Sequence, residues 1–475
     1  MFWQLKNTLA RYVVPALCSG YFATAISTAK ADDFIISSSS TDENGGYTID
    51  GSDTLTITSD GSIIRPRVCP TCGGTRAVDV TGDDNIVTVN GLLETVGADR
   101  ANTLVATGDN NLLTINGLLS PRGFQSRGIE IDGNGNTANI STTGRIVTYG
   151  NGLQYAINIT GNDNAVNVSG LVHSTRTNSS NPSHAIRVGT AVNTQINISG
   201  TVRADADGVA AVRLNSGASS TTVTLQNDAR IIGEFQDVGS NNTLRFNVGS
   251  AQSFVFATSG NWTLQDLDGR AVVAGSAMAA GIGNAETADE LMFDRSMSLD
   301  NSLARLERQS SFGERQAIFD AYGFSQSRDE DGTTSAFELD SRGITIGLPL
   351  ELLGNQAIAF VNYHDSEIDI SSGTHDIDAQ SVRFGLSVPQ TWSGENYNIG
   401  VYAVAGRSSY DGTRDVLVNQ NTTTGITTIN ASWDSTELEI GADVTSNMAL
   451  ASKLTLDSSL GLAAQVERIG SYAEE

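Results

Sequence analysis

The 475-residue sequence predicts an all-β protein: a right-handed parallel β-helix, then one helix and an incomplete antiparallel transmembrane β-barrel. A Gly/Asn-rich unit recurs with a period in the mid twenties, and such a period is typical of stacked repeats. A charged amphipathic segment follows the repeats. In the last third, apolar and polar residues alternate over segments of about ten, which is typical of outer-membrane strands. We therefore divide the chain into an N-terminal segment (1–31), the repeat region (32–268), a linker with the helix (269–311) and the alternating region (312–475).

Charge restricts the classes of partner. The chain carries 28 Lys+Arg against 53 Asp+Glu, a formal net charge of −25. The only lysines are Lys6, Lys30 and Lys453, so no basic run is present to neutralise a phosphate backbone. Nucleic acid is therefore not expected as a partner.

Residues 1–31 have the features of a secretory signal peptide. Lys6 and Arg11 precede a mostly apolar stretch, and Ala-Lys-Ala supplies a cleavage site after Ala31. A transmembrane helix is the alternative, but Pro15 and polar residues interrupt the stretch before it reaches the length of a span. We expect an exported protein.

The mature chain keeps two cysteines, Cys69 and Cys72, in Cys-Pro-Thr-Cys. In an exported protein such a pair most simply forms a small local disulfide. A redox-active pair would need a βαβ context and a zinc site a second pair of ligands, and the sequence supplies neither. The nonapeptide of calcium-binding β-rolls is also missing. We therefore expect a structural disulfide, no metal and no cofactor.

The repeat is explicit in the sequence. Residues 81–93 return almost unchanged as 107–119, and weaker copies follow at 160–172 and 192–202. Each unit reads as a turn, a strand, a glycine and a second strand, with Val, Ile or Leu alternating with Thr, Asn or Ser. The units show neither helical spacing nor the signature of propeller blades, which leaves a parallel β-helix.

Stacked rungs place equivalent residues in columns. The turn asparagines Asn85, Asn111, Asn136 and Asn164 should form a ladder whose amides bond one another along the axis; the alternative is that asparagine is merely tolerated in turns. The residues expected to point inward are Ile86, Val89, Leu112, Ile115, Val166, Val168, Ile196 and Ile198.

Residues 285–310 are the one convincing helical stretch. After it, strands are expected near 314–326, 335–350, 355–370, 378–390, 395–411, 427–446 and 452–467. Alternation turns Ile344, Ile346, Leu348, Val382, Phe384, Leu386, Leu454 and Leu456 toward lipid, and Arg383, Glu437, Glu439 and Asp443 toward the lumen. Tyr322, Trp392, Tyr397, Tyr410 and Trp433 are expected in an aromatic girdle. A soluble β-sandwich is the alternative, but it gives no reason for these charges to share one face.

The order of signal peptide, β-helical repeats, small-residue junction, charged helix and alternating region resembles a type V secretion autotransporter of a Gram-negative bacterium. The resemblance implies a passenger carried to the cell surface by a C-terminal barrel, with the helix inside the pore. It implies outer-membrane lipid and the barrel-assembly machinery as partners, and a host or sister-cell surface as the target of the passenger. It further implies that residues 233–268, with their aromatic side chains, start passenger folding. Some relatives cleave themselves at a helix asparagine; here Asn301 is the candidate, and we expect the passenger to stay attached.

One feature departs from the family. Seven strands are fewer than the even number, at least about eight, that closes a bacterial barrel. The terminal aromatic residue of such barrels is also missing after Ala473. We therefore expect either a fragment of a longer reading frame or a defective barrel, and we expect this chain alone not to insert.

Sequence motifs for enzymatic chemistry are absent. Serine protease and esterase motifs are not found, and His173 and His184 lie between rungs, where we expect surface residues. Adhesion or self-association is the favoured function. The alternatives are a polysaccharide-active enzyme using acids such as Asp132, Asp205 or Asp207, and an inert surface stalk.

Overall fold

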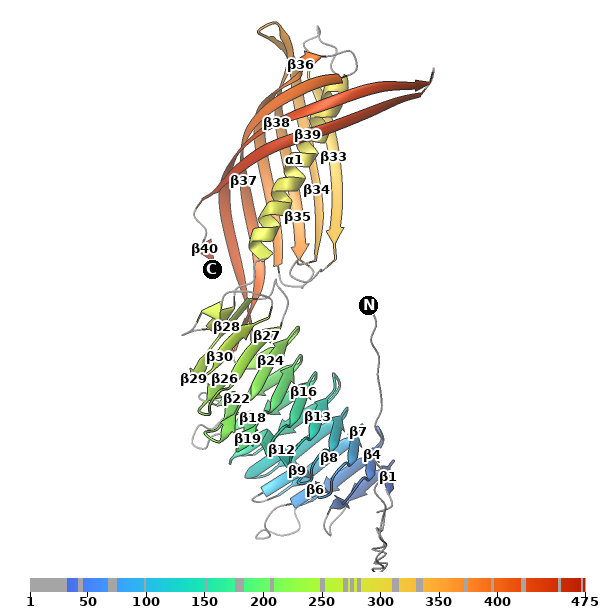
Figure 1. Ribbon diagram of the computed structural model, residues 1–475, viewed down its shortest axis with the longest axis vertical. Coiled ribbons are helices and arrows are strands. Elements are labelled where there is room, and N and C mark those ends of the chain that lie inside the picture. Colours follow the sequence, from blue (N-terminus) through green and yellow to red (C-terminus); the bar gives the residue numbers. More distant parts are fainter. Residues whose placement is uncertain are drawn as a thin grey trace, which may run out of the picture.

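The computed structural model describes residues 32–41, 46–66, 75–97, 100–150, 152–175, 183–205, 209–247, 253–267, 272–273, 277–279, 283–309, 316–329, 336–370, 375–393, 397–419, 424–451, 454–470 and 473–474. The predicted cleavage site at Ala31, the predicted disulfide between Cys69 and Cys72, and Asp207 lie outside the described residues. Figure 1 shows two bodies in sequence order, a stack of short strands and a curved sheet of long strands.

The N-terminal body is a parallel β-solenoid with three sheets, as the repeat predicts. Sheet A contains β1 (Asp33–Ile36), β4 (Thr54–Ile57), β7 (Ile86–Val89), β10 (Leu112–Ile115), β13 (Thr137–Ile140), β16 (Ala165–Val168), β20 (Gln195–Ile198), β24 (Thr222–Gln226), β27 (Thr243–Asn247) and β30 (Thr263–Asp266). Sheet B contains β2 (Ser39–Thr41), β5 (Ser62–Arg65), β8 (Leu92–Val96), β11 (Leu118–Arg122), β14 (Arg145–Thr148), β17 (Leu171–Ser174), β21 (Thr201–Ala204) and β25 (Arg230–Ile232). Sheet C contains β3 (Tyr47–Ile49), β6 (Thr75–Val80), β9 (Arg100–Ala106), β12 (Gln125–Asp132), β15 (Gln154–Thr160), β18 (His184–Val188), β22 (Ala210–Leu214), β26 (Glu234–Asp237) and β29 (Thr258–Gly260). A small pair, β19 (Ala191–Val192) and β23 (Ala218–Ser219), lies at a turn.

The solenoid core follows the alternation within each strand. Val89, Ile115, Val166, Val168, Ile196 and Ile198 are buried as predicted. The prediction was wrong for Ile86, which is 44% exposed, and for Leu112, which is half-buried. A strand alternates with a period of two, so Val89 inside places Val87, not Ile86, in the core; Leu113 replaces Leu112 for the same reason.

The predicted asparagine ladder is present: the Asn85 amide donates to Asn111 Oδ1 at 2.9 Å, as predicted, and backbone N–H groups supply the other bonds. Asn85, Asn111, Asn136 and Asn164 are all buried. The Oδ1 atom of each of the last three accepts the backbone N–H of the asparagine one rung earlier, at 2.8, 2.8 and 2.9 Å. These amides thus satisfy buried backbone donors at every turn. The preceding residues Asp84, Asn110, Gly135 and Asp163 all have positive φ, which explains why Asp, Asn and Gly recur there.

Two histidines lie in strands and not in surface loops, which corrects the prediction. His184 begins β18 and is 1% exposed, and its Nδ1 atom accepts the backbone N–H of Ala210 at 3.1 Å. His173 lies in β17, where its Nε2 atom is 2.8 Å from Asp205. Each ring is therefore held by a specific partner.

After the last rungs come β28 (Ser253–Phe256), β31 (Val272–Val273), β32 (Ala277–Ala279) and the helix α1 (Gly283–Gln309). The C-terminal body is an antiparallel sheet of β33 (Ile318–Arg328), β34 (Phe337–Leu352), β35 (Asn355–Ile370), β36 (His375–Ser393), β37 (Tyr397–Val418), β38 (Ile426–Ala451) and β39 (Leu454–Ile469), with β40 (Ala473–Glu474) beside β38. The seven long strands match the seven predicted segments. Within the described residues, β33 and β39 are not paired with each other.

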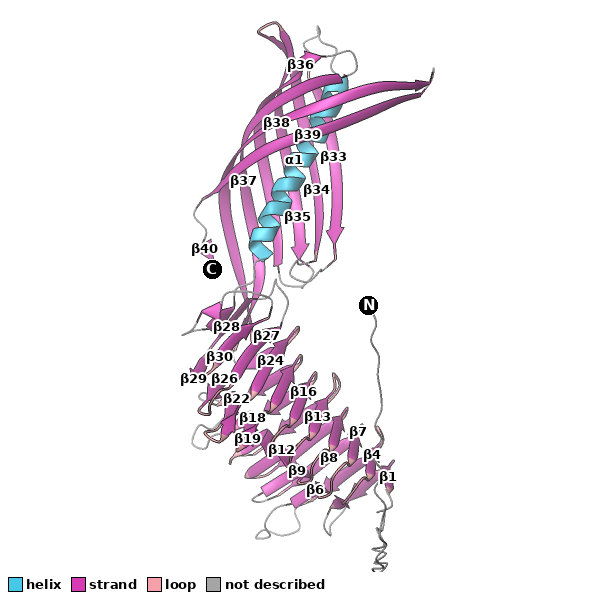
Figure 2. Ribbon diagram, viewed as in Figure 1, coloured by secondary structure: helices cyan, strands magenta, loops and turns pink. Residues whose placement is uncertain are grey.

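The helix lies against the curved face of this sheet, as Figure 2 shows. Leu299, Leu303 and Leu306 pack with Ile358, Phe360 and Tyr402 of the sheet. Among the described residues, no helix combines the length and apolarity needed to span a membrane.

Candidate functional site

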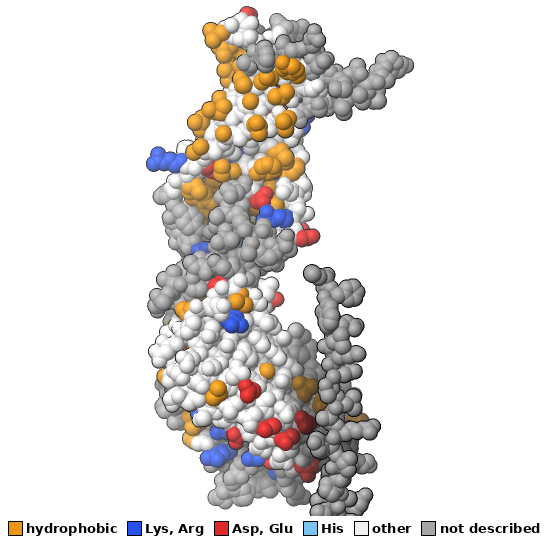
Figure 3. Space-filling model, viewed as in Figure 1, with side chains coloured by type: hydrophobic (Ala, Val, Ile, Leu, Met, Phe, Trp, Pro, Cys, Tyr) orange, Lys and Arg blue, Asp and Glu red, His pale blue; other side chains and the backbone are white. Residues whose placement is uncertain are grey.

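The outward face of the antiparallel sheet carries an apolar belt. Ile344, Ile346, Leu348, Val382 and Phe384 are exposed, as the alternation predicts, and Leu386 is half-buried. The side chains of Leu454 and Leu456 lie outside the described part of β39. Figure 3 shows hydrophobic side chains gathered on the surface of the C-terminal body. Side chains exposed in this way suit a lipid environment.

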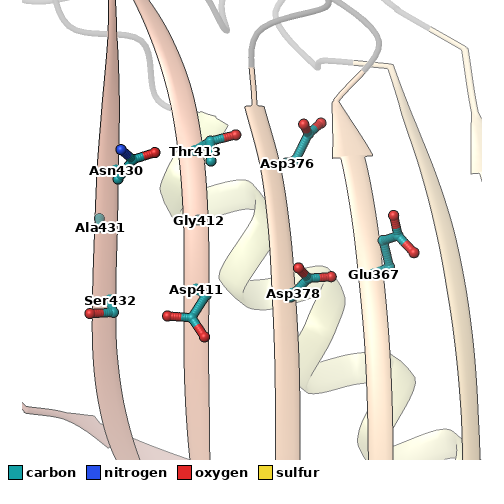
Figure 4. A pocket seen from close by; sticks show the side chains of 9 residues that line it. All are labelled: Glu367, Asp376, Asp378, Asp411, Gly412, Thr413, Asn430, Ala431 and Ser432. Atoms are coloured by element: carbon teal, nitrogen blue, oxygen red, sulfur yellow. The ribbon is translucent and has the colours of Figure 1, made fainter.

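A carboxylate-rich region adjoins the belt. The same outward positions change from apolar to acidic toward the β35–β36 turn. There a shallow groove of about 440 Å³ is lined by Glu367, Asp376, Asp378 and Asp411, together with polar residues of β37 and β38 (Figure 4). Charge at these positions marks the end of the surface that lipid tails could cover.

The prediction of an aromatic girdle is wrong for Tyr322, Tyr410 and Trp433. Tyr322 points to the helix side, where its hydroxyl is 3.0 Å from His364 Nδ1. Tyr410 is buried and donates to Glu467, and Trp433 stacks on it with ring centroids 5.1 Å apart. These three belong to the inward set of their strands, so their polar atoms serve the interior. Tyr397 is exposed as expected, and the side chain of Trp392 is not described.

The inward face holds a buried charge network around α1. Arg295 of the helix is 1% exposed, donates to Glu467 at 2.8 Å and to Ser408 at 2.5 Å, and lies 3.8 Å from Glu437. Arg383 of β36 lies 3.8 Å from Glu437 and 3.7 Å from Glu439. As predicted, Arg383, Glu437 and Glu439 face the helix, whereas Asp443 is only half-buried. Charges removed from water need such partners.

More contacts fix the rotation of the helix within the sheet. Ser296 donates to Glu439 at 2.7 Å, and the Asp294 carboxylate lies 2.9 Å from His364 Nε2. Ser302 donates to Asp320 at 2.8 Å. Helix residues therefore contact several different strands, and these contacts fix the position and rotation of the helix against the sheet.

The sequence model of the autotransporter β-domain matches residues 318–475. These residues are an autotransporter β-domain. With the preceding solenoid and helix, the chain fits an autotransporter, a protein of the Gram-negative outer membrane. No curated protein and no solved structure matches the chain. The solenoid is accordingly called the passenger below.

The β-domain also contributes to the passenger. Strand β37 continues past the predicted end of that strand and pairs in parallel with β28 through Val416, Leu417 and Val418. Leu417 joins the solenoid core, and Ile426 packs against it. Asn419, which follows Val418, accepts the Ala257 N–H at 2.8 Å and donates to the Ala257 carbonyl at 3.0 Å. The β37–β38 hairpin therefore caps the apolar core where the rungs end.

The last rungs are aromatic, as the resemblance implies. Phe246 lies 4.7 Å from Phe256 between ring centroids, and Phe235 lies 6.3 Å from both Phe256 and Trp262. Phe254 belongs to the same cluster. This packing forms the base to which the hairpin adds.

The candidate cleavage residue Asn301 is exposed on α1, and the adjacent Asp300 is half-buried toward β39. Within the described residues, no group of three or more His, Cys, Asp or Glu is arranged to hold a metal ion. The sequence did not predict the contacts of Arg295, the Asp294–His364 contact, or the roles of Leu417 and Asn419. Only the alternation, which placed Glu437 and Glu439 inside, pointed to the network.

Proposed function

We propose that the passenger is displayed at the cell surface, where it mediates adhesion or self-association and has no enzymatic activity of its own. The supporting observation is the outer face of sheet A. One outward column runs through Thr56, Thr88, Thr114, Asn139, Asn167, Asn197 and Thr224, one residue per rung. Over these seven rungs the column contains no charged side chain, and the next rung carries Arg245.

The column is also ordered along the solenoid axis. Asn167 donates to Asn139 at 2.8 Å, and Asn197 donates to Asn167 at 2.9 Å. A regular row of amides and hydroxyls presents many equivalent, individually weak contacts, and such contacts gain strength when many engage together. A sister cell or host surface is the target that this arrangement suits.

The acids considered for catalysis do not support an enzyme. Asp205 at the end of β21 is engaged by His173 and by Arg203. Asp132 at the end of β12 accepts the hydroxyl of Thr160 at 2.7 Å. Asp132 lies at the end of a sheet C strand and Asp205 follows a sheet B strand. The contacts of these two acids do not supply the facing pair of carboxyl groups that glycoside hydrolysis needs.

Beads coated with the full chain test the proposal. We expect coated beads to aggregate and to release no reducing sugar from polysaccharides. Thr114→Arg with Asn167→Arg should reduce aggregation, because like charges would face one another across any sheet A contact. A matched pair on sheet B, Leu118→Arg with Leu171→Arg, should leave aggregation unchanged. Equal loss in both pairs, or no aggregation by the unaltered chain, would contradict the proposal.

The same proposal keeps the passenger attached, with outer-membrane lipid against the apolar belt and the barrel-assembly machinery as the route of insertion. Buried contacts from Asp294 to Ser302 hold the helix on the β-domain. A free passenger ending at Asn301 in the culture supernatant would argue against attachment; Asn301→Ala would then have to abolish its release for Asn301 to be the cleavage residue.

A further inference from the structure

Sheet C carries two adjacent arginines on its outer face. Arg187 of β18 and Arg213 of β22 are direct partners in the parallel register. Neighbouring strands in a sheet lie about 4.8 Å apart, so the two side chains project from the outer face next to each other. Like charges at such a pair of positions repel each other.

The partners of these arginines are neutral amides. Arg187 donates to Asn158 at 2.6 Å, and Arg213 donates to Gln236 at 2.8 Å and to Asn215 at 3.1 Å. Neither forms an ion pair with any residue that the structure describes. Arg76 and Arg127 of sheet C differ, because Arg76 pairs with Asp79 and Arg127 with Glu130. Arg100 of the same sheet also donates to a neutral amide, that of Gln125 at 3.3 Å, but it has no second arginine as its direct partner. The positive charge of the pair is therefore left without a carboxylate.

The surroundings confirm a local excess of positive charge. Burial, and after it the charges of Arg213 and Arg187, lower the pKa of His184 to about 3. The Arg187 guanidinium also lies 5.1 Å from the ring centroid of Tyr155, which fixes its plane. In a chain with a net charge of −25, this pair stands out as a cationic site.

The geometry points to a binding site for an acidic polysaccharide on sheet C, with Arg187 and Arg213 holding successive carboxylates. Guanidinium groups bind carboxylates through paired hydrogen bonds, and two of them side by side can bind two carboxylates of one polymer. Duplex nucleic acid fits less well, since its affinity depends on many neutralised phosphates. This face is separate from sheet A, so the inference goes beyond self-association.

Binding of polygalacturonate to the full chain in detergent micelles tests the site, with dextran as the neutral polymer. We expect salt-sensitive binding of polygalacturonate and none of dextran. Arg187→Gln with Arg213→Gln should weaken the Kd about tenfold or more. Arg145→Gln with Arg230→Gln, which removes the same charge from sheet B, should leave it unchanged. Bead aggregation should persist in both, which separates this site from the proposed function.

A second variant distinguishes a specific loss of binding from a loss of folding. Arg187→Lys with Arg213→Lys keeps the charge but removes the paired geometry, so it should bind measurably less tightly than the unaltered chain. The inference is overturned if polygalacturonate does not bind, if both glutamine pairs lose affinity equally, if the lysine pair binds as well as the arginines, or if duplex DNA binds as tightly as polygalacturonate.

Discussion

Replacing Arg295 by methionine tests the buried network most sharply. The guanidinium is 1% exposed, bonds Glu467 at 2.8 Å and lies 3.8 Å from Glu437. Arg295→Met keeps most of the side-chain volume but leaves the Glu467 carboxylate without its cation, whereas Glu437 keeps Arg383 at 3.8 Å. Breaking a buried pair from one side costs about 3 to 5 kcal/mol, so we expect a loss of that size in the free energy of unfolding of the β-domain.

The assay is urea unfolding of the full chain in detergent micelles, followed by the gel mobility of unheated samples. Arg308→Met, at the exposed end of the same helix, serves as control and should change stability by no more than about 0.5 kcal/mol. Adding Glu467→Gln to Arg295→Met should recover most of the loss, since the carboxylate left without a cation is then replaced by a neutral amide. Equal midpoints for Arg295→Met and Arg308→Met would refute the reasoning.

Three further predictions follow from other parts of the molecule. In the full-length protein, Phe384→Arg, in the apolar belt, should cost about 2 to 4 kcal/mol in lipid and reduce the folded β-domain in outer-membrane fractions, whereas Ser432→Arg, in the acidic groove, should not. Burial lowers the pKa of His184 from 6.5 to about 3. The contribution of His184 to the free energy of unfolding of the passenger should therefore be fully present above pH 6.5 and should be lost toward pH 3, by at most about 1.4 kcal/mol per pH unit. His184→Asn keeps an acceptor for the Ala210 N–H and should flatten that pH dependence in urea unfolding; an unchanged slope would contradict the assignment. Leu417→Asp should expose the last rungs to limited proteolysis by placing a charge in an apolar core, and a digestion pattern like that of the unaltered chain would count against the capping role.

The solenoid could be predicted because its information is local and repeated. Each unit carries its own turn residues, and Asn85 and Asn111 occupy equivalent places in successive copies, so one correct rung predicts the others. The errors at Ile86 and Leu112 came from a spacing of three residues within a strand whose side chains alternate every two.

The β-domain network could be predicted only in part. Alternation placed Glu437 and Glu439 on the inner face, but their partners lie far away in sequence; Arg295 and Glu467 are 172 residues apart. Likewise, no local pattern distinguishes the end of β37 that lies in the sheet from the end that caps the passenger. Tyr322 and Tyr410 were misplaced because an aromatic ring with a hydroxyl suits either a membrane interface or a buried hydrogen bond.

The central proposal is that this chain, with its autotransporter β-domain in the outer membrane, displays its passenger outside the cell. Protease treatment of intact cells of the bacterium that makes it, followed by separate detection of passenger and β-domain, tests that claim most directly. We predict that the passenger is digested while a β-domain fragment remains protected in the outer membrane. Digestion of the passenger only after the outer membrane has been permeabilised would contradict the claim.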